Sequence, residues 1–549
     1  MKRYLLLFSL LIHFINYSQQ YPTESINKIL RSHVSSASQP GLTIGVVKNN
    51  KLIYHNSIGY MQLADAIPFN DTTIFDLASV TKQFTSACIG ILENQGKLSL
   101  DDDVRKYIPE LAIYADTIRI KHLLNHTSGI RNHNVLLDLK GFDYQHQGYT
   151  NQMIQELMFY QKGVNNLPGE KMLYSNTNYV LLALIVERVS EMKIHAFAKQ
   201  ELFEPMEMKN SFYRSKLDEE IKNKAYPYYK VDDAYQQHKS LTLCVGAGGM
   251  ESTVQDLAQW SRIFLDETNR LSYLGDFITK LDTLNNGTPM KHARGMFIDN
   301  YRNFKTLNHS GRDVGMRSQF ICIPEKNLAV IIFTNSEEIN ATNISYQILD
   351  LFFTDTSTND STVNHYTHSA IELKKFVGVY QEMNSDLRMT IFMENDSLKA
   401  MSSLGNTPTP LVSHSKNTFC RTNNSSIKYS FKKGLADASD LNVDFGGAIF
   451  YFEKVDLALN PNQNLEDYVG NYYSEELHVT YSIRLENDNL ILSYPNNENI
   501  VITEGVKDTF GSNRRTKYFF IRDNQGTVVS FKVAAEGTVK DILFNKTIE

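Results

Sequence analysis

The chain has 549 residues, of which 42% are hydrophobic and 21% charged, a composition typical of a soluble globular protein. It excludes wholesale disorder, a collagen-like fibre and a polytopic membrane protein, and the length predicts several domains rather than one. The formal net charge of −6 sets up no strong field of either sign, so a nucleic acid is not favoured as a partner.

The first residues have the layout of a secretory signal peptide. Lys2 and Arg3 precede an apolar stretch from Tyr4 to Ile15, and a polar run follows. The stretch is too short to span a bilayer comfortably, and no later run approaches the length of a transmembrane helix. We therefore expect cleavage near Ser18, no transmembrane segment in the mature chain, and export to the periplasm or medium of a bacterium. The alternative for this segment is an uncleaved anchor.

Two predicted β-hairpins frame a mostly helical stretch. Each pairs two β-rich runs around turn residues, at 41–47 with 52–58 and at 317–323 with 328–333. Apolar residues at helical spacing predict a helix over 81–96 and a buried helix over 177–189. This order predicts an α+β domain, in which an antiparallel sheet is closed by the two chain ends and flanked by helices.

The last third of the chain contains an internal repeat. Residues 373–380 (Leu-Lys-Lys-Phe-Val-Gly-Val-Tyr) recur as 465–472 (Leu-Glu-Asp-Tyr-Val-Gly-Asn-Tyr), and short alternating strands follow each copy. This pattern predicts two small antiparallel β-barrels, because closure removes exposed strand edges. A polar run before the first copy is typical of a linker. We expect a signal peptide over 1–18, the α+β domain over 19–353, the linker over 354–370, and barrels over 371–456 and 464–549.

Ser79 and Lys82 have Ser-x-x-Lys spacing at the predicted start of a helix. There, side chains at i and i+3 share a face, and free N–H groups favour an anion. A desolvated lysine one turn away can take the proton of a serine hydroxyl, which is otherwise a poor nucleophile. The same spacing occurs elsewhere in the chain, so only the position at the start of a helix makes this pair a candidate for catalysis.

Two further elements contain polar residues that can do chemistry. Tyr174 and Asn176 form a Tyr-x-Asn element, which by itself is more often a core tyrosine with a helix cap. A tyrosine acts as a base only where nearby positive charge favours its phenolate. Residues 309–311 (His-Ser-Gly) precede the second hairpin, and the glycine would let the backbone approach a ligand closely. A lone histidine, however, is more often structural.

The sequence predicts no metal and no cofactor. Asp101, Asp102 and Asp103 are adjacent, but acidic residues that open a helix are a commoner meaning than metal ligands. The four cysteines are far apart, so packed free thiols are favoured over a disulfide or a zinc site.

In their order along the chain, these motifs resemble the serine β-lactamase and penicillin-binding-protein superfamily, in its class C-like branch of DD-peptidases, esterases and D-amino-acid peptidases. The likeness extends over roughly residues 44–335. It rests on five blocks: Phe75-Asp-Leu-Ala-Ser-Val-Thr-Lys82, Gly96-Lys-Leu-Ser-Leu-Asp-Asp102, His122-Leu-Leu-Asn-His-Thr-Ser-Gly129, Pro168-Gly-Glu-Lys-Met-Leu-Tyr-Ser-Asn176 and Gly248-Gly-Met-Glu-Ser-Thr-Val-Gln-Asp-Leu257.

The resemblance implies a role for each matching residue. Ser79 is similar to the acylated nucleophile, Lys82 to its proton partner, Tyr174 to the general base, and Asn176 to a substrate-positioning amide. The backbone N–H groups of Ser79 and Arg312 would form an oxyanion hole. The duplicated tail is similar to the lipocalin-like C-terminal barrels of the D-aminopeptidase relatives.

His309, Ser310 and Gly311 stand where the penicillin-hydrolysing enzymes have Lys-Thr-Gly. A histidine is neutral for much of the time near pH 7, so it does not supply a fixed positive charge for a substrate carboxylate. We therefore expect an exported serine hydrolase that acts through an acyl-enzyme on small peptide amides or esters, including peptides that contain D-amino acids. Two alternatives stay open: a β-lactamase that hydrolyses penicillins or cephalosporins, and a non-catalytic protein that binds peptidoglycan fragments or a partner. The oligomeric state is not predicted.

Overall fold

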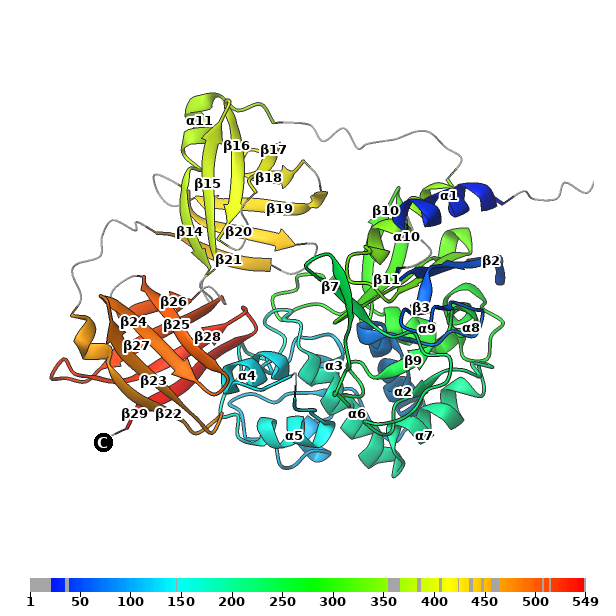
Figure 1. The fold of residues 1–549 in the computed structure, drawn as a ribbon, viewed down its shortest axis with the longest axis horizontal. Helices are drawn as coiled ribbons and strands as arrows, with labels where there is room; N and C mark the ends of the chain where they lie inside the picture. The colour runs from blue at the N-terminus through cyan, green and yellow to red at the C-terminus, as the bar shows by residue number, and fades with distance from the viewer. Residues whose placement is uncertain are drawn as a thin grey trace, which may run out of the picture.

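The computed structural model describes residues 21–547 apart from 35–38, 145, 354–365, 383–386, 404–406, 423, 434–437, 446–448, 456–463, 506–507 and 513–514. The predicted signal peptide, most of the linker and nearly all of the joint between the repeats lie outside the described residues. Figure 1 shows a helix-rich N-terminal domain with two β-barrels beside it. Within the described ranges, no helix is long and apolar enough to cross a membrane.

The N-terminal domain is built on a six-stranded antiparallel sheet with the order β10-β11-β12-β13-β1-β2. Its strands are β1 (Leu42–Lys48), β2 (Lys51–Ile58), β10 (Phe297–Tyr301), β11 (Phe304–Asp313), β12 (Met316–Ile323) and β13 (Leu328–Thr334). Both predicted hairpins are present, as β1–β2 and β12–β13. The two ends of the domain close the sheet as expected, because β1 pairs with β13 along its whole length.

The sheet contains two strands that the sequence analysis did not predict. β10 and β11 precede the second hairpin, and residues 309–311 lie inside β11. β11 pairs with β12 from Leu307 to Asp313. Most of its residues are polar, so it lacks the apolar run by which β12 and β13 were recognised.

The predicted helices are present with shifted ends. α2 covers Lys82–Asn94, and residues 78–81 before it form a 3-10 turn, η1 (Ala78–Thr81), so Ser79 lies on that turn. The second predicted helix is α6 (Asn176–Ser190), which is buried over most of its length as expected. The others are α1 (Thr23–His33), α3 (Ile120–Leu124), α4 (His133–Lys140), α5 (Asn151–Phe159), α7 (Ile194–Ala198), α8 (Val254–Leu265), α9 (Ser272–Thr279), α10 (Ala341–Asp350) and α11 (Ala370–Lys374).

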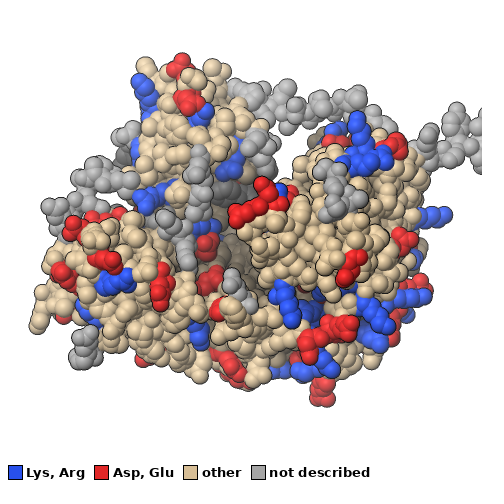
Figure 2. All heavy atoms as spheres, in the orientation of Figure 1, with Lys and Arg blue, Asp and Glu red and all other residues tan. Residues whose placement is uncertain are grey.

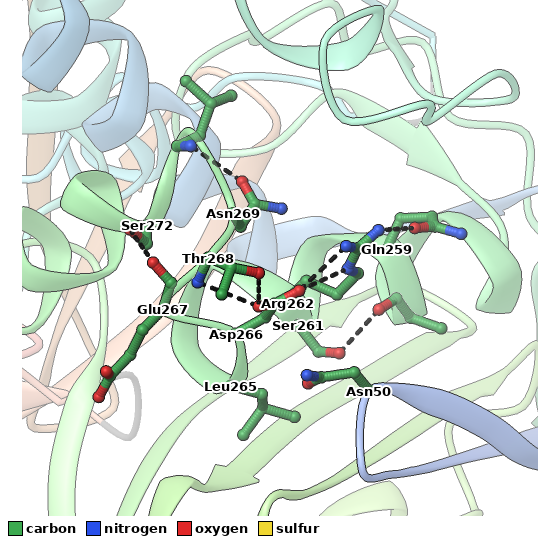
Figure 3. Close-up of polar contacts among 12 residues, drawn as sticks. Asn50, Gln259, Ser261, Arg262, Leu265, Asp266, Glu267, Thr268, Asn269 and Ser272 are labelled. Atoms are coloured by element: carbon green, nitrogen blue, oxygen red, sulfur yellow. Dashed lines mark hydrogen bonds and ion pairs between the residues drawn. The ribbon is translucent and has the colours of Figure 1, made fainter.

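Helices cover both faces of the sheet (Figure 1). α8 packs on β1 and β13 as part of the main core, which also contains α2 and α6. α1 and α10 belong to a second apolar cluster against the other face. Figure 3 shows how α8 ends: Arg262 pairs with Asp266 at 3.0 Å, and Asp266 accepts the Thr268 N–H at 3.1 Å.

Short strands complete the N-terminal domain. They are β3 (Tyr60–Gln62), β4 (Ile67–Pro68), β5 (Phe75–Asp76), β6 (Phe212–Tyr213), β7 (Tyr228–Val231), β8 (Ala234–Gln237) and β9 (Met250–Ser252). β5 pairs with β9, which also pairs with β6. This three-stranded sheet anchors the chain immediately before Ser79.

As predicted, the C-terminal repeats form two closed antiparallel barrels; the structure shows that each has eight strands. The first contains β14 (Gly378–Glu382), β15 (Arg388–Glu394), β16 (Ser397–Ser402), β17 (Thr409–Ser415), β18 (Thr418–Arg421), β19 (Asn424–Lys433), β20 (Ala438–Phe445) and β21 (Ile449–Val455). The second contains β22 (Gly470–Ser474), β23 (Val479–Glu486), β24 (Asn489–Tyr494), β25 (Asn497–Glu504), β26 (Thr509–Ser512), β27 (Thr516–Arg522), β28 (Val528–Ala535) and β29 (Val539–Lys546).

The repeated sequence makes the same local contact in both barrels. Tyr380 donates its hydroxyl proton to the Phe376 carbonyl at 2.9 Å, and Tyr472 donates to the Tyr468 carbonyl, also at 2.9 Å. All four rings are buried in their barrel cores. The internal repeat therefore reflects one module used twice.

Charge and cysteine usage agree with the sequence analysis. Figure 2 shows acidic and basic side chains interspersed on the face in view. All four cysteines are free thiols, and Cys88, Cys322 and Cys420 are buried. Cys244 is partly exposed.

Candidate active site

The Ser79 and Lys82 side chains meet at the start of α2. Lys82 Nζ lies 3.0 Å from Ser79 Oγ. The chain turns sharply before them, because Ala78 has a φ of +46°, which is rare for a residue with a side chain. Asp76 stabilises this turn by accepting the Ala78 N–H at 2.7 Å. Ser79 is thereby presented partly exposed, with its N–H among the first-turn groups that have no intrahelical carbonyl.

Lys82 is completely buried. Besides Ser79, its Nζ donates to Asn176 Oδ1 at 2.9 Å and to the Ala247 carbonyl at 2.8 Å. No carboxylate is among these partners, and burial lowers the pKa of Lys82 to about 7, with a small opposing effect of Cys244. The amine is therefore neutral in a large fraction of molecules near pH 7.

Tyr174 lies over Lys82 and against a histidine. Lys82 Nζ is 5.0 Å from the centroid of the Tyr174 ring, and the His126 ring centroid is 4.2 Å from it. Burial raises the pKa of Tyr174, and a hydrogen bond with Ser79 opposes this only in part. Tyr174 is therefore a phenol, not a phenolate, near neutral pH.

Three buried histidines surround Tyr174. The ring centroids of His292 and His309 lie 6.2 and 6.3 Å from the Tyr174 ring, and His126 is closer. Burial lowers the pKa of His309 to about 3 and those of the other two well below their usual value, with Lys82 adding to the effect. His309 directs Nδ1 at the Ser310 carbonyl, 2.7 Å away. The cluster is therefore uncharged near neutral pH.

β11 passes directly beside the turn that carries Ser79. A Cβ atom on Gly311 would lie 2.3 Å from the Leu77 carbonyl oxygen and 2.1 Å from Ser318 Oγ, so the approach requires a glycine. Ser318 Oγ donates to the same Leu77 carbonyl at 2.7 Å. Arg312 follows on the strand with its side chain exposed, which leaves its backbone next to this contact.

A cavity of about 620 Å³ adjoins the site. Asp76 and Asp313, which precede Ser79 and follow Arg312 in the chain, line it together with Arg214 and Met316. Desolvation by neighbouring groups and the nearby Asp76 carboxylate raise the pKa of Asp313. Neither Ser79 nor Lys82 is among the residues that line this cavity, so it is a neighbour of the site and not the site itself.

The structure brings the side chains of Ser79, Lys82, Tyr174, Asn176 and His309 together, with Ser310, Gly311 and Arg312 following on β11. Asn134, whose Oδ1 accepts the Asn176 amide proton at 2.8 Å, and the Ala247 carbonyl were not among the predicted site groups. Nor were His126 and His292. His126 lies within a block quoted for the family resemblance, whereas Ala247 contributes only its backbone and so leaves no side-chain signal.

Within the described part of the chain, no group of three or more His, Cys, Asp or Glu residues is arranged to hold a metal ion. The acidic run at 101–103 instead opens a 3-10 turn, η2 (Val104–Lys106), as predicted. Asp103 accepts the Arg105 N–H at 2.9 Å.

The family model described as Beta-lactamase matches residues 26–350. Among curated proteins, penicillin-binding protein 4* of Bacillus subtilis (strain 168) is 29% identical over 324 residues, which cover 54% of this chain and 68% of that protein. Protein flp of Staphylococcus aureus (strain N315) is 26% identical over 359 residues, covering 63% of this chain and 68% of that protein. The family match ends before the first barrel.

Solved structures share the fold at lower identity. The octameric penicillin-binding protein homologue from Pyrococcus abyssi has a TM-score of 0.55 and 22% identity, covering 79% of this chain and 100% of its own. The D-amino acid amidase from Ochrobactrum anthropi SV3, complexed with D-phenylalanine, has a TM-score of 0.51 and 20% identity, covering 60% and 98%.

Proposed function

This chain belongs to the Beta-lactamase family, and on that premise we propose that it is a serine hydrolase in which Ser79 forms an acyl-enzyme with peptide amides or esters. The observation that carries the proposal is the state of Lys82. Its amine lies 3.0 Å from Ser79 Oγ, is fully buried, and has a pKa lowered to about 7. A neutral amine at this distance can take the serine proton, which makes the hydroxyl a nucleophile.

The geometry supports a sequence of proton transfers. Ser79 Oγ attacks the substrate carbonyl carbon while its proton passes to Lys82. The N–H groups of Ser79 and Arg312 stabilise the negative oxygen of the tetrahedral intermediate. Tyr174, protonated because burial raises its pKa, donates to the leaving amine or alkoxide and regains a proton from Lys82. Water then attacks the acyl-enzyme with the same groups in reverse roles, releasing the acid and restoring Ser79.

The charge state of the site favours peptide amides and esters over β-lactams. His309 stands in place of a lysine, is buried, and has a pKa lowered to about 3, so it is neutral at working pH. A substrate carboxylate would meet no fixed positive charge there. Structural neighbours named as a D-amino acid amidase and a D-stereospecific amidohydrolase support peptides with D-amino acids as one substrate class. The charged and then apolar N-terminal segment supports export from a bacterium.

A reactive fluorophosphonate tests the proposal. The intact mass of the protein should increase by one adduct, and Ser79→Ala should show none. A panel of a chromogenic ester, D- and L-aminoacyl anilides and a chromogenic cephalosporin then ranks the substrates. Absence of an adduct on folded protein would reject the hydrolase, and faster turnover of the cephalosporin than of every ester and anilide would favour the β-lactamase.

A further inference from the structure

The two barrels differ in how they join the N-terminal domain. The core of the second barrel is continuous with the main core of that domain, whereas the first barrel has a separate core. Tyr481, stacked on Tyr494 at 4.4 Å, donates to the Leu139 carbonyl at 2.6 Å, at the end of α4. Next to it, Gly141 is so close to the barrel that a Cβ atom would lie 2.0 Å from the Pro495 carbonyl oxygen. The second barrel is thus packed into the N-terminal domain.

A buried ion pair crosses this interface. Arg131 and Glu476 are only 2% and 7% exposed, and Arg131 Nη1 lies 2.5 Å from Glu476 Oε2. The same carboxylate oxygen accepts the Lys162 N–H at 2.8 Å, and Arg131 also donates to Gln161 Oε1 at 3.1 Å. Breaking a buried pair by removing one charge leaves the other uncompensated and is strongly destabilising locally. Glu476 therefore determines where the Arg131 segment lies.

The Arg131 segment leads directly to the candidate site. The Arg131 carbonyl accepts the Thr177 hydroxyl at 2.8 Å, and Thr177 Oγ1 accepts the His133 N–H at 2.8 Å. The next residue, Asn134, holds the Asn176 amide at 2.8 Å, and Asn176 in turn accepts from Lys82. Four hydrogen bonds and one ion pair thus connect the barrel to the amine beside Ser79.

The barrel also holds the other side of this segment. The Asn132 N–H donates to the Thr538 carbonyl at 3.3 Å, just before α4 begins. Asn165 Nδ2 donates to the same carbonyl at 2.7 Å, and Asn165 N–H donates to the Gly129 carbonyl at 2.7 Å. Since Tyr481 binds the far end of α4, the barrel contacts the helix at both ends.

We propose that the second barrel is part of the catalytic unit, and that Glu476 is a positioning residue which, through Arg131, keeps Asn134 and Asn176 in place on Lys82. We call this connection, from Glu476 through Arg131 to Asn134 and Asn176, the clamp. Its effect on the rate rests on the proposed function, whereas its effect on the position of α4 does not. Among the described residues the core of the first barrel is separate from that of the N-terminal domain, so we include only the second barrel in this unit.

The test compares Glu476→Gln with its neighbour Glu475→Gln. Glu475 pairs with Lys162 at the surface, where the two side chains are 64% and 67% exposed, so its loss is expected to change nothing. Glu476→Gln keeps the shape but removes the charge. We expect the fluorophosphonate to acylate it roughly 10- to 100-fold more slowly, because a misplacement of about 1 Å costs about 100-fold in rate. Glu476→Asp, which retains the charge, should recover part of that loss.

The pH profile distinguishes positioning from simple loss of folded protein. A loosened α4 admits water to Lys82 and raises its pKa toward the usual value, so the acid limb of acylation should move to higher pH. The titratable groups that face Lys82 are neutral near pH 7, because burial lowers the pKa of the histidines and raises those of the tyrosines and the cysteine. They are Tyr174, Tyr179, Cys244, His126, His133, His292 and His309. A smaller active fraction would lower the rate without moving the limb.

Hydrogen exchange gives a readout that needs no catalysis. The amides of α4 should exchange faster in Glu476→Gln than in Glu475→Gln or the parent protein. If the parent is not acylated, the proposed function fails, and the exchange rates of the α4 amides alone test whether Glu476 holds α4 in place. If the parent is acylated, and Glu476→Gln matches it in rate, pH profile and α4 exchange, the clamp is refuted and the hydrolase stands.

Discussion

The rate at which a fluorophosphonate acylates Ser79 should follow the protonation state of Lys82. Burial lowers the pKa of this lysine from 10.5 to about 7, a cost to the charged form of roughly 5 kcal/mol at about 1.4 kcal/mol for each tenfold change. At pH 7.5 about three quarters of the molecules would hold a neutral amine, against about one in a thousand for an exposed lysine. The fraction of neutral, reactive amine at position 82 is therefore roughly 1000-fold larger than for an exposed lysine.

The assay is the second-order rate constant of labelling between pH 5 and pH 9.5, followed by intact mass. It should rise about tenfold for each pH unit up to roughly pH 6.5 and reach a plateau above pH 8. Glu251 is the control, because it is also buried and its pKa is raised to about 7. Glu251→Gln should leave the acid limb where it is. A rate independent of pH between 5.5 and 8.5, or a limb that disappears with Glu251, would refute the role given to Lys82.

Other consequences are open to direct measurement. Below pH 7 Lys82 is charged in both the folded and the unfolded state, so the folded state bears the full cost of burying the charge. This cost disappears as the pH rises toward 10.5, because the folded state loses the proton first, and the free energy of unfolding in urea should therefore increase by roughly 3 kcal/mol between pH 7 and pH 9.5. The increase should be absent in Lys82→Met. Gly311→Ala places a methyl group 2.3 Å from a carbonyl oxygen, and it should lower the free energy of unfolding by about 1–3 kcal/mol and abolish labelling. In the control Gly248→Ala the nearest new contact is 3.8 Å, so its melting temperature should match that of the parent. A chain ending at Phe353 should be insoluble or fail to unfold cooperatively. Arg131 loses its buried partner at a cost of about 3–5 kcal/mol, and the apolar core shared with the second barrel is exposed. A soluble, cooperatively folded product with the parent's labelling rate would contradict this.

Much of the fold follows from patterns that act over a few residues. The hairpins β1–β2 and β12–β13 are recognisable because β-rich runs bracket turn residues, and α2 because its apolar residues recur at helical spacing. The second barrel is predictable because its sequence repeats the first. Ser79 and Lys82 are adjacent on one turn, so their pairing too is a local property.

The contacts that complete the site join residues far apart in the chain. Lys82 donates to Ala247, Asn176 binds Asn134, and Arg131 pairs with Glu476 more than 300 residues away. β11 escaped prediction for a related reason, since its polar residues become buried only through the neighbouring layers. Periodicity and turn chemistry record local geometry, whereas the partner of a buried polar group depends on which surfaces pack together. The sequence by itself therefore determined the two hairpins, α2, α6, the duplicated barrels and the serine–lysine pair. Tertiary packing decided which groups bury the lysine, lower its pKa and hold the asparagine against it.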